Sequence, residues 1–258
     1  KGEIKYLSEI AKPDLGVITN ISESHLINFE NMSGVYEEKV ELLKSLTKNG
    51  IAFLNMDDPF IATTNLYDRC KVIKYGFSDD LDYSAKYNNE DSNIIIINND
   101  TINIPTFANI LPENILTVFS ISSELGVDVN SFNESLSSFQ VPAGRGNIIN
   151  HNNYIIINDS YNANYSSVKS GLEMIGKIKR KKRILIVLGD MLELGKDEEK
   201  LHKKLLNHIL KNKVSHVFTY GPLMHSLYLE GKKESKLDIK HYKNQELLIS
   251  DLREAIGS

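Results

Sequence analysis

The most constraining feature of the sequence is a series of short β-branched runs that alternate with helix-like segments. Three such runs occur in the first part of the chain: LGVITNI at residues 15–21, IAFLN at 51–55 and KVIKYG at 71–76. Strands that alternate with helical stretches are typical of a parallel sheet covered by helices. The sequence therefore predicts an α/β fold.

A different pattern follows this first unit. The segments DYSAKYN, NIIIIN and TINIP lie close together with Asn and Asp between them, notably at residues 98–100, which predicts a small antiparallel sheet. Helices are expected at about 112–125 and 130–138. The stretch VPAGRG at residues 141–146 then breaks the pattern. We therefore expect two domains, residues 1–143 and residues 144–258.

The second predicted domain repeats the α/β alternation. YIIIND, RILIVLG and HVFTYG are strand-like runs, and helical stretches are expected around residues 166–178, 197–211 and 245–256. This order predicts a second α/β domain. With 258 residues, 41% of them hydrophobic, the chain is long enough to bury a substantial core.

Composition and charge exclude several functional classes. A net charge of −4 gives no general reason to bind nucleic acid or an anionic membrane. The basic run KRKKR at residues 179–183 is interpreted as a solvated turn. The apolar runs are too short to cross a bilayer, and the single cysteine, Cys70, agrees with a reducing compartment. A cytoplasmic protein without membrane insertion is expected.

A lysine interrupts the first long helical pattern. After Ser33, the spacing places Val35, Leu42 and Leu46 on one stripe, and the missing member of that stripe is Lys39. One explanation is that the buried stripe is the neighbouring one, Val40 and Leu43, so that Lys39 extends to water. The other is that its amine meets a charged group in a cleft, because an unpaired buried ammonium is costly.

A histidine lies where α/β sheets build their ligand sites. His25, in TNISESHL, comes just after a predicted strand. Ligands bind open α/β sheets at the carboxyl ends of the strands. A loop histidine on its own is more often a surface residue than a ligand, so other motifs have to decide its role.

Several motifs occur in an order that resembles the Mur ligases. The resemblance extends over most of the chain. Its motifs are GEI at residues 2–4, ITNISESHL at 18–26, Lys39, LNMDD at 54–58, GR at 144–145, NDSYNAN at 158–164 and LGDMLELG at 188–195. The last two motifs resemble the MurF type within that family. The resemblance implies an α/β fold in which part of a P-loop-type ATPase central domain is followed by a Rossmann-like C-terminal domain.

The resemblance implies roles for residues of a metal and nucleotide site. Glu3 and His25 match residues that help to hold Mg²⁺, and Lys39 matches a lysine that reacts with CO₂ to form an N6-carboxylated side chain. Such a carbamate offers oxygen atoms, which Mg²⁺ prefers. Arg145 resembles an arginine that contacts ATP phosphate, and Asp159 an acid near the ATP ribose.

Further residues are assigned to ATP and substrate by the same resemblance. Nucleotide contacts are implied for Asn20, Tyr161 and Asn162, and Asn114 resembles an adenine-contacting asparagine, although Leu111, Glu113 and Thr117 replace the glycine, histidine and second asparagine of that pattern. The dipeptide side is assigned to Asn164, Asp190 and Glu193, and the acids have a plain alternative role as helix caps.

The implied reaction is the ATP-dependent addition of D-Ala-D-Ala to UDP-N-acetylmuramoyl-tripeptide, by a monomeric enzyme that needs Mg²⁺. The Gly-rich phosphate loop of the family, ending in Gly-Lys-Thr or Gly-Lys-Ser, does not occur in the sequence. GLEMIGKI at residues 171–178 has similar spacing but lies in a helical stretch. Because the loop precedes GEI in the family, we expect a fragment that lacks the loop, the N-terminal domain and the extreme C-terminus, and that is inactive alone.

Two other classes of function remain open. Another Mur-type or folylpolyglutamate synthase-like ligase would share His25, Lys39 and Asp159. A non-catalytic nucleotide-binding module that lost its phosphate loop would keep the same fold. A nicotinamide-dependent dehydrogenase is disfavoured, because no G-x-G-x-x-G follows a strand.

Overall fold

A computed structural model describes residues 2–22, 29, 31–66, 69–88, 91, 93–105, 111–151, 153–177 and 183–257. They form two compact units, the first from residues 1–22 and 29–161 and the second mainly from residues 162–258. No helix in these described ranges is long and apolar enough to cross a membrane.

The first unit is built on one sheet of six strands that are hydrogen-bonded in sequence order. The neighbours from β1 to β4 run parallel, and β4, β5 and β6 run antiparallel. The strands are β1 (Leu15–Ile18), β2 (Ile51–Asn55), β3 (Lys71–Gly76), β4 (Tyr83–Tyr87), β5 (Ile94–Ile97) and β6 (Asp100–Asn103). The predicted combination of a parallel sheet with a small antiparallel part is confirmed.

Local sequence signals explain where the helices of this unit begin. The Asn31 side chain accepts a hydrogen bond from the Gly34 N–H, and Asp128 does the same for the Asn130 and Ser131 N–H groups. The helices are α1 (Glu3–Ala11), α2 (Met32–Lys44), the 3₁₀ turn η2 (Ile61–Thr63), α3 (Pro112–Glu124) and α4 (Val129–Ser138).

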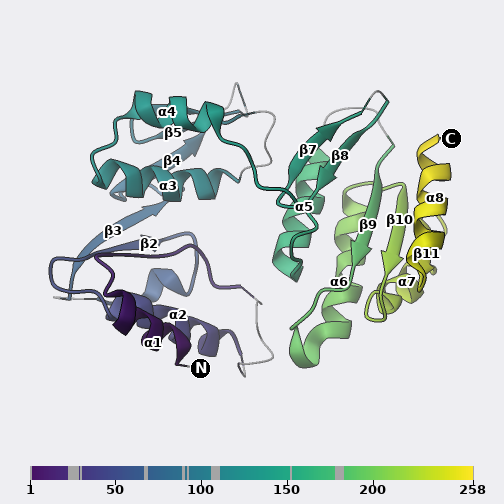
Figure 1. Cartoon of the computed structure of the whole chain (residues 1–258), viewed down its shortest axis with the longest axis horizontal. Coiled ribbons are helices and arrows are strands. Elements are labelled where there is room, and N and C mark those ends of the chain that lie inside the picture. The colour runs from purple at the N-terminus through teal and green to yellow at the C-terminus, as the bar shows by residue number, and fades with distance from the viewer. Residues whose placement is uncertain are drawn as a thin grey trace. The chain divides into compact units, whose positions relative to one another are not determined.

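An aromatic and isoleucine-rich core holds the antiparallel end of the sheet under α3 and α4 (Figure 1). Phe119 of α3 meets Phe132 of α4 edge to face, with 5.1 Å between ring centroids. Ile95, Ile97 and Ile102 are fully buried beneath them. The two-residue turn after β5 has Asn98 at a positive φ of 53°, which asparagine tolerates well.

A hairpin closes the first unit. β7 (Asn147–Asn150) pairs antiparallel with β8 (Ile155–Asn158), with Ile148 opposite Ile157. We expected YIIIND to belong to the second α/β sheet, but β8 pairs with β7 and with no other described strand. The reason is the short connection, in which His151 and Tyr154 stack with 4.4 Å between ring centroids and return the chain at once.

The second unit has a parallel sheet with helices on both faces (Figure 1). Successive residues of β10 point to opposite faces, so that Val217 packs under α6 and α7 whereas Phe218 packs under α8. The strands, in the order β11-β10-β9, are β9 (Leu185–Gly189), β10 (His216–Tyr220) and β11 (Asp238–Tyr242). The helices are α5 (Tyr165–Lys177), η3 (Gly195–Asp197), α6 (Glu198–Lys211), α7 (His225–Gly231) and α8 (Gln245–Gly257).

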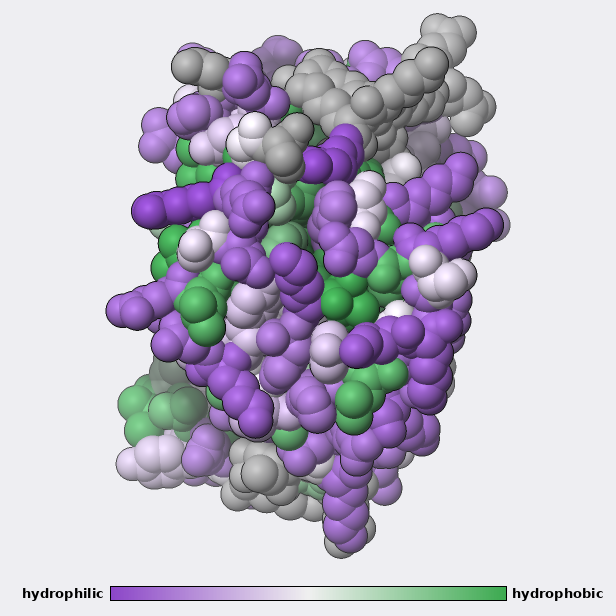
Figure 2. All heavy atoms as spheres, turned by 90° about the vertical axis from the view of Figure 1, so that its right-hand side faces the viewer, coloured by the Kyte–Doolittle hydropathy of each residue, from purple (hydrophilic) through white to green (hydrophobic). Residues whose placement is uncertain are grey.

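The outer surface of α8 is mostly polar. Leu247 and Ile249 are 61% and 40% exposed, but Figure 2 shows a predominantly hydrophilic face with apolar side chains in small separate groups. Scattered apolar side chains of this kind are normal on a folded domain and indicate no binding surface.

Candidate functional site

Lys39 lies half-buried on α2, and its amine points to the loop that follows β1. The Nζ atom donates a hydrogen bond of 2.9 Å to the backbone carbonyl of Asn20. Val40 and Leu43 are buried, as one explanation of the sequence pattern predicted, and Val35 is buried as well. The amine of Lys39 nevertheless meets the end of a strand instead of water alone.

The environment makes this lysine less basic than usual. Partial burial lowers the pKa of Lys39, and the charge of Asp58 opposes that effect. A lowered pKa increases the fraction of neutral amine, which is the form that can react as a nucleophile. The position therefore suits a lysine that is modified or that acts chemically.

The LNMDD motif joins the three strand ends near Lys39. Asn55 donates to the Thr19 carbonyl beyond β1, at 2.8 Å. Both carboxylate oxygens of Asp57 accept the Phe77 N–H beyond β3, at 3.0 Å. Asp58, only 8% exposed, accepts the Ile21 N–H at 2.7 Å. The motif thus fixes the loop that presents Asn20 to Lys39.

Asp58 also begins the turn after β2. Its second oxygen accepts the N–H groups of Phe60 and Ile61, at 2.9 and 3.0 Å. One buried carboxylate therefore accepts hydrogen bonds from three backbone N–H groups in two separate segments. Burying these N–H groups without an acceptor would be costly.

A glutamate that the sequence did not single out holds the GEI segment. Glu38, on α2, is 7% exposed and accepts hydrogen bonds from the Gly2 N–H at 2.7 and 2.9 Å and from the Ile4 N–H at 3.1 Å. These bonds lower the pKa of Glu38, with the Gly2 contribution largest. A carboxylate is favourable there because the first N–H groups of α1 carry partial positive charge. Glu3 itself is exposed in the first turn of α1.

The predicted metal ligands are only partly described. His25 lies outside the described residues. Within the described ranges, no three His, Cys, Asp or Glu side chains come together as a metal site. The donor chemistry of Lys39 fits Mg²⁺ once the amine carries a carboxyl group, because a carbamate supplies oxygen and an ammonium would repel the ion.

Arg145 and the NDSYNAN motif meet in the first unit. The Arg145 guanidinium lies over the Tyr161 ring, with 3.9 Å from Cζ to the ring centroid. Partial desolvation raises the pKa of Asp159, and the nearby charge of Arg145 lowers it. The structure thus brings together a cation, an aromatic ring and an acid that were all predicted to face ATP.

Backbone contacts hold the two segments against each other. The Tyr161 N–H donates to the Gly144 carbonyl at 2.9 Å, and the Gly146 N–H donates to the Asn158 carbonyl at 2.8 Å. Gly144 has a φ of 79°, and an added Cβ atom would lie 3.2 Å from the Tyr161 nitrogen. Glycine is therefore needed at this crossing.

Asn114 is exposed in the first turn of α3. Thr117, which stands where the resembling pattern has a second asparagine, is buried, and its hydroxyl lies 3.1 Å from the Tyr75 hydroxyl and donates to the Glu113 carbonyl. The departure from the pattern at Thr117 thus serves the core of the first unit.

The last residues of NDSYNAN start a helix in the second unit. Asn164 accepts the Ser167 N–H at 2.9 Å, and its own N–H donates to the Ser167 hydroxyl at 3.1 Å, which is a reciprocal cap of α5. Tyr165 takes the first helical position, and its hydroxyl lies 3.1 Å from Nε2 of His208. Asn162 is exposed.

Asp190 has a structural role that reaches across the sheet. Its carboxylate accepts the N–H groups of Leu223 and Met224, at 3.2 and 2.7 Å, ahead of α7. Asp190 therefore caps the turn before α7 and not the helix that directly follows its own loop. Glu193 is exposed, with a positive φ of 62°.

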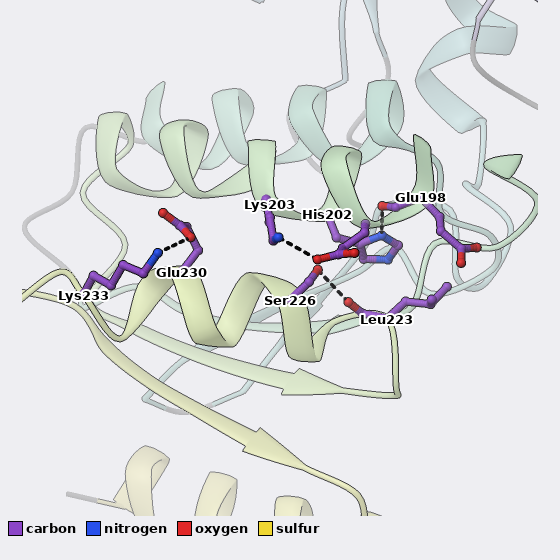
Figure 3. A network of polar contacts seen from close by, with 8 residues as sticks. Glu198, His202, Lys203, Leu223, Ser226, Glu230 and Lys233 are labelled. Carbon is purple, nitrogen blue, oxygen red and sulfur yellow. Dashed lines mark hydrogen bonds and ion pairs between the residues drawn. The ribbon is translucent and has the colours of Figure 1, made fainter. Parts of the chain in front are cut away.

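His202 anchors the LGDMLELG loop, and no local pattern in the sequence points to it. The residue is fully buried on α6, where Nε2 accepts the Met191 N–H at 3.0 Å. Nδ1 therefore carries the proton and donates to the Glu198 carbonyl at 2.6 Å, a contact drawn in Figure 3. Ser226 and Leu223 pair at the neighbouring start of α7.

The segment GLEMIGKI is not a phosphate loop. Gly171 and Gly176 both lie inside α5, whereas a phosphate loop joins a strand to a helix. Gly176 is explained by packing, because a Cβ atom there would collide with the side chain of Asn212.

Two family models match the chain. The Mur ligase middle domain matches residues 1–122, and the Mur ligase glutamate ligase domain matches residues 144–257. Similar proteins include the UDP-N-acetylmuramoyl-tripeptide--D-alanyl-D-alanine ligases of Bacillus subtilis and Rickettsia prowazekii, at 32% and 31% identity over 98% of this chain. The chain spans 56% and 58% of their lengths.

Solved structures share the fold. MurF from Acinetobacter baumannii superposes with a TM-score of 0.82 at 22% identity, over 98% of this chain and 56% of that protein. MurF ligase from Thermotoga maritima in complex with ADP gives 0.79 at 23% identity, over 98% and 58%. With both domain models and the curated relatives in agreement along almost all of its length, this chain belongs to the Mur ligase family.

Proposed function

We propose that the protein is a MurF-type ligase, which uses ATP to join D-Ala-D-Ala to UDP-N-acetylmuramoyl-tripeptide during cytoplasmic synthesis of peptidoglycan precursors. The observation that carries the ligase chemistry in this proposal is Lys39, whose amine is half-buried, lowered in pKa and directed at the end of β1. The names of the curated relatives support the choice of substrates.

In this proposal, residues 1–143 contribute to the ATP-binding domain and residues 144–258 form the C-terminal domain. Arg145 contacts ATP phosphate through its planar guanidinium, and Asp159 accepts hydrogen bonds from ribose hydroxyls. Other residues assigned to the nucleotide are Asn20, Asn114, Tyr161 and Asn162. The dipeptide side is assigned to Asn164, Asp190 and Glu193.

Mg²⁺ is assigned to Glu3, His25 and a carboxylated Lys39. When bound, the ion would neutralise charge on the ATP phosphates. Lys39 suits this assignment because its lowered pKa favours the neutral amine that CO₂ modifies. The backbone bond from Nζ to Asn20 holds the same nitrogen at the strand end, where open α/β sheets bind ligands.

The proposed chemistry has two balanced steps. The terminal carboxylate of the tripeptide attacks the γ-phosphorus, so that a new C–O–P link forms and ADP leaves. The amine of D-Ala-D-Ala then attacks the acyl carbon, loses a proton and expels inorganic phosphate as the amide bond forms. Positioned cations stabilise the charge that develops in both steps, and alignment of the two substrates supplies much of the rate.

The proposal is tested by measuring ADP release by the complete gene product. The protein is supplied with ATP, Mg²⁺, UDP-N-acetylmuramoyl-tripeptide and either D-Ala-D-Ala or single amino acids. Release that requires D-Ala-D-Ala supports a MurF-type ligase. Release with another amine would assign a different ligase of the family, and no release with any amine would favour a nucleotide-binding module.

A matched pair of lysine variants tests the central residue. Lys39→Ala is expected to abolish the amine-dependent ADP release. Lys44→Ala is the control, because Lys44 is exposed on the same helix and its amine forms an ion pair with Glu41 at 2.8 Å. A monomer is our expectation for the oligomeric state, and sedimentation measures it.

A further inference from the structure

Arg145 is unusual among the proposed nucleotide contacts because its guanidinium lies against an aromatic ring. Cζ of Arg145 lies 3.9 Å from the centroid of the Tyr161 ring. In the described part of the chain, the guanidinium makes no hydrogen bond and no ion pair with another residue. The charge of Arg145 lowers the pKa of Asp159, but the described residues show no ion pair between the two side chains. The N–H donors of Arg145 are therefore available for an anion.

A backbone hydrogen bond fixes the position of Tyr161. Its N–H donates to the carbonyl of Gly144, the residue that precedes Arg145, so the two segments that carry Tyr161 and Arg145 are held together. Gly144 permits the close approach through its positive φ. The side chain remains 67% exposed, so little hydrophobic burial explains the aromatic residue. What the ring contributes is a flat surface for the guanidinium.

We propose that Tyr161 is a positioning residue that holds Arg145 in place by stacking and that acts on ATP only through Arg145. This inference rests on the proposed function, in which Arg145 contacts phosphate, and it replaces a direct nucleotide contact for Tyr161. An arginine side chain loses considerable rotamer freedom when it binds a ligand, and a stack that restricts it beforehand reduces that loss. The phenol hydroxyl has no part in this role.

The size of the effect follows from the exposure of the stack. A cation above an exposed aromatic ring gains about 0.5–1 kcal/mol, which corresponds to a factor of about two to five in affinity. Tyr161→Leu is expected to weaken ATP binding by that factor, and Tyr161→Phe is expected to leave it unchanged. Once Arg145→Ala has removed the cation, Tyr161→Leu should cause no further loss.

The test is a double-mutant cycle on the protein as encoded, with the non-hydrolysable ATP analogue AMP-PNP as the probe in calorimetric titration. The four proteins are wild type, Tyr161→Leu, Arg145→Ala and the double variant, with Tyr161→Phe as a fifth. Tyr6→Leu is the control, because Tyr6 is similarly exposed, at 64%, and far from Arg145 in sequence. Thermal unfolding of each variant is recorded to show that the fold is kept.

We expect Tyr161→Leu to weaken AMP-PNP binding in the wild-type background and to have no effect in the Arg145→Ala background. Tyr161→Phe is expected to bind AMP-PNP as wild type does. An equal loss in both backgrounds would mean that Tyr161 touches the nucleotide itself, and it would overturn the inference. A neutral Tyr161→Leu beside a weakened Arg145→Ala would also overturn it. If Arg145→Ala binds AMP-PNP normally, both the inference and the phosphate role of Arg145 fall, while ADP release that requires D-Ala-D-Ala would still support the ligase.

Discussion

Replacing Asp58 tests how the strand ends near Lys39 are held. Asp58 accepts three backbone N–H groups with two oxygens: Oδ2 takes Ile21, and Oδ1 takes Phe60 and Ile61. Asp58→Ala leaves these donors without partners in a buried place. At about 1–3 kcal/mol for each buried donor, partly relieved by water, we expect a loss of about 3–5 kcal/mol in the stability of the first unit.

Asp58→Asn separates the two halves of this interaction. An amide oxygen in the place of Oδ1 keeps Phe60 and Ile61, but the amide nitrogen then faces the Ile21 N–H, and two donors repel. The expected loss is about 1–2 kcal/mol and is confined to the loop after β1. The change also removes the charge that raises the pKa of Lys39, so that pKa should fall further.

Hydrogen exchange at individual amides is the decisive assay. In Asp58→Asn, the Ile21 amide should exchange roughly tenfold faster, since a factor of ten corresponds to about 1.4 kcal/mol, whereas Phe60 and Ile61 keep their protection. Asp57→Asn is the control, because both oxygens of Asp57 serve the same Phe77 donor and one remains. Unchanged Ile21 exchange in Asp58→Asn, or an Asp58→Ala protein within about 0.5 kcal/mol of wild type, would refute the reasoning.

Three further predictions follow from single contacts. Lys39→Met should raise the stability of the first unit at neutral pH while it removes activity, because the lowered pKa means that folding disfavours the charged amine. A lower unfolding midpoint in urea would contradict this. The pKa of Glu38 in the folded protein is below its ordinary 4.5, so the stability that Glu38 contributes is complete above that value and is lost as the pH falls through the lower folded pKa. Glu38→Gln should therefore make acid unfolding less steep in that range. An unchanged dependence of stability on acid pH would contradict this prediction. Gly221→Ala should lower the free energy of unfolding by at least about 2 kcal/mol, because φ is 105° and the new Cβ atom would lie 2.5 Å from Cγ of Asp190. Gly189→Ala is the control in the same urea titration, because an added Cβ atom meets no other atom there.

Strands with apolar runs were predictable, and strands without them were not. LGVITNI, IAFLN and KVIKYG form β1, β2 and β3, and RILIVLG and HVFTYG form β9 and β10. DIKHY, which forms β11, was missed because it contains no apolar run and buries only Ile239 and Tyr242. Charged and polar residues at its other positions leave its pattern weak.

Helical periodicity singled out one residue of the candidate site, and most of the others, such as Arg145 and Asp159, were assigned by the resemblance to the Mur ligases. Lys39 stood out because helical spacing called for an apolar residue at its position. Glu38, Asp58 and His202 could not be found in this way, because their partners Gly2, Ile21 and Met191 lie 36, 37 and 11 residues away. Pairings of that kind depend on how the chain folds back, and local periodicity carries no information about them.

The most direct test of the proposed chemistry follows oxygen from the tripeptide carboxylate. The complete gene product is incubated with ATP, Mg²⁺, D-Ala-D-Ala and UDP-N-acetylmuramoyl-tripeptide labelled with ¹⁸O in its terminal carboxylate. The masses of the released phosphate and of the UDP-linked product are then measured by mass spectrometry. Attack of that carboxylate on the γ-phosphorus predicts one ¹⁸O atom in each phosphate released, together with the UDP-linked pentapeptide. Unlabelled phosphate, or ADP formed without the pentapeptide, would contradict it.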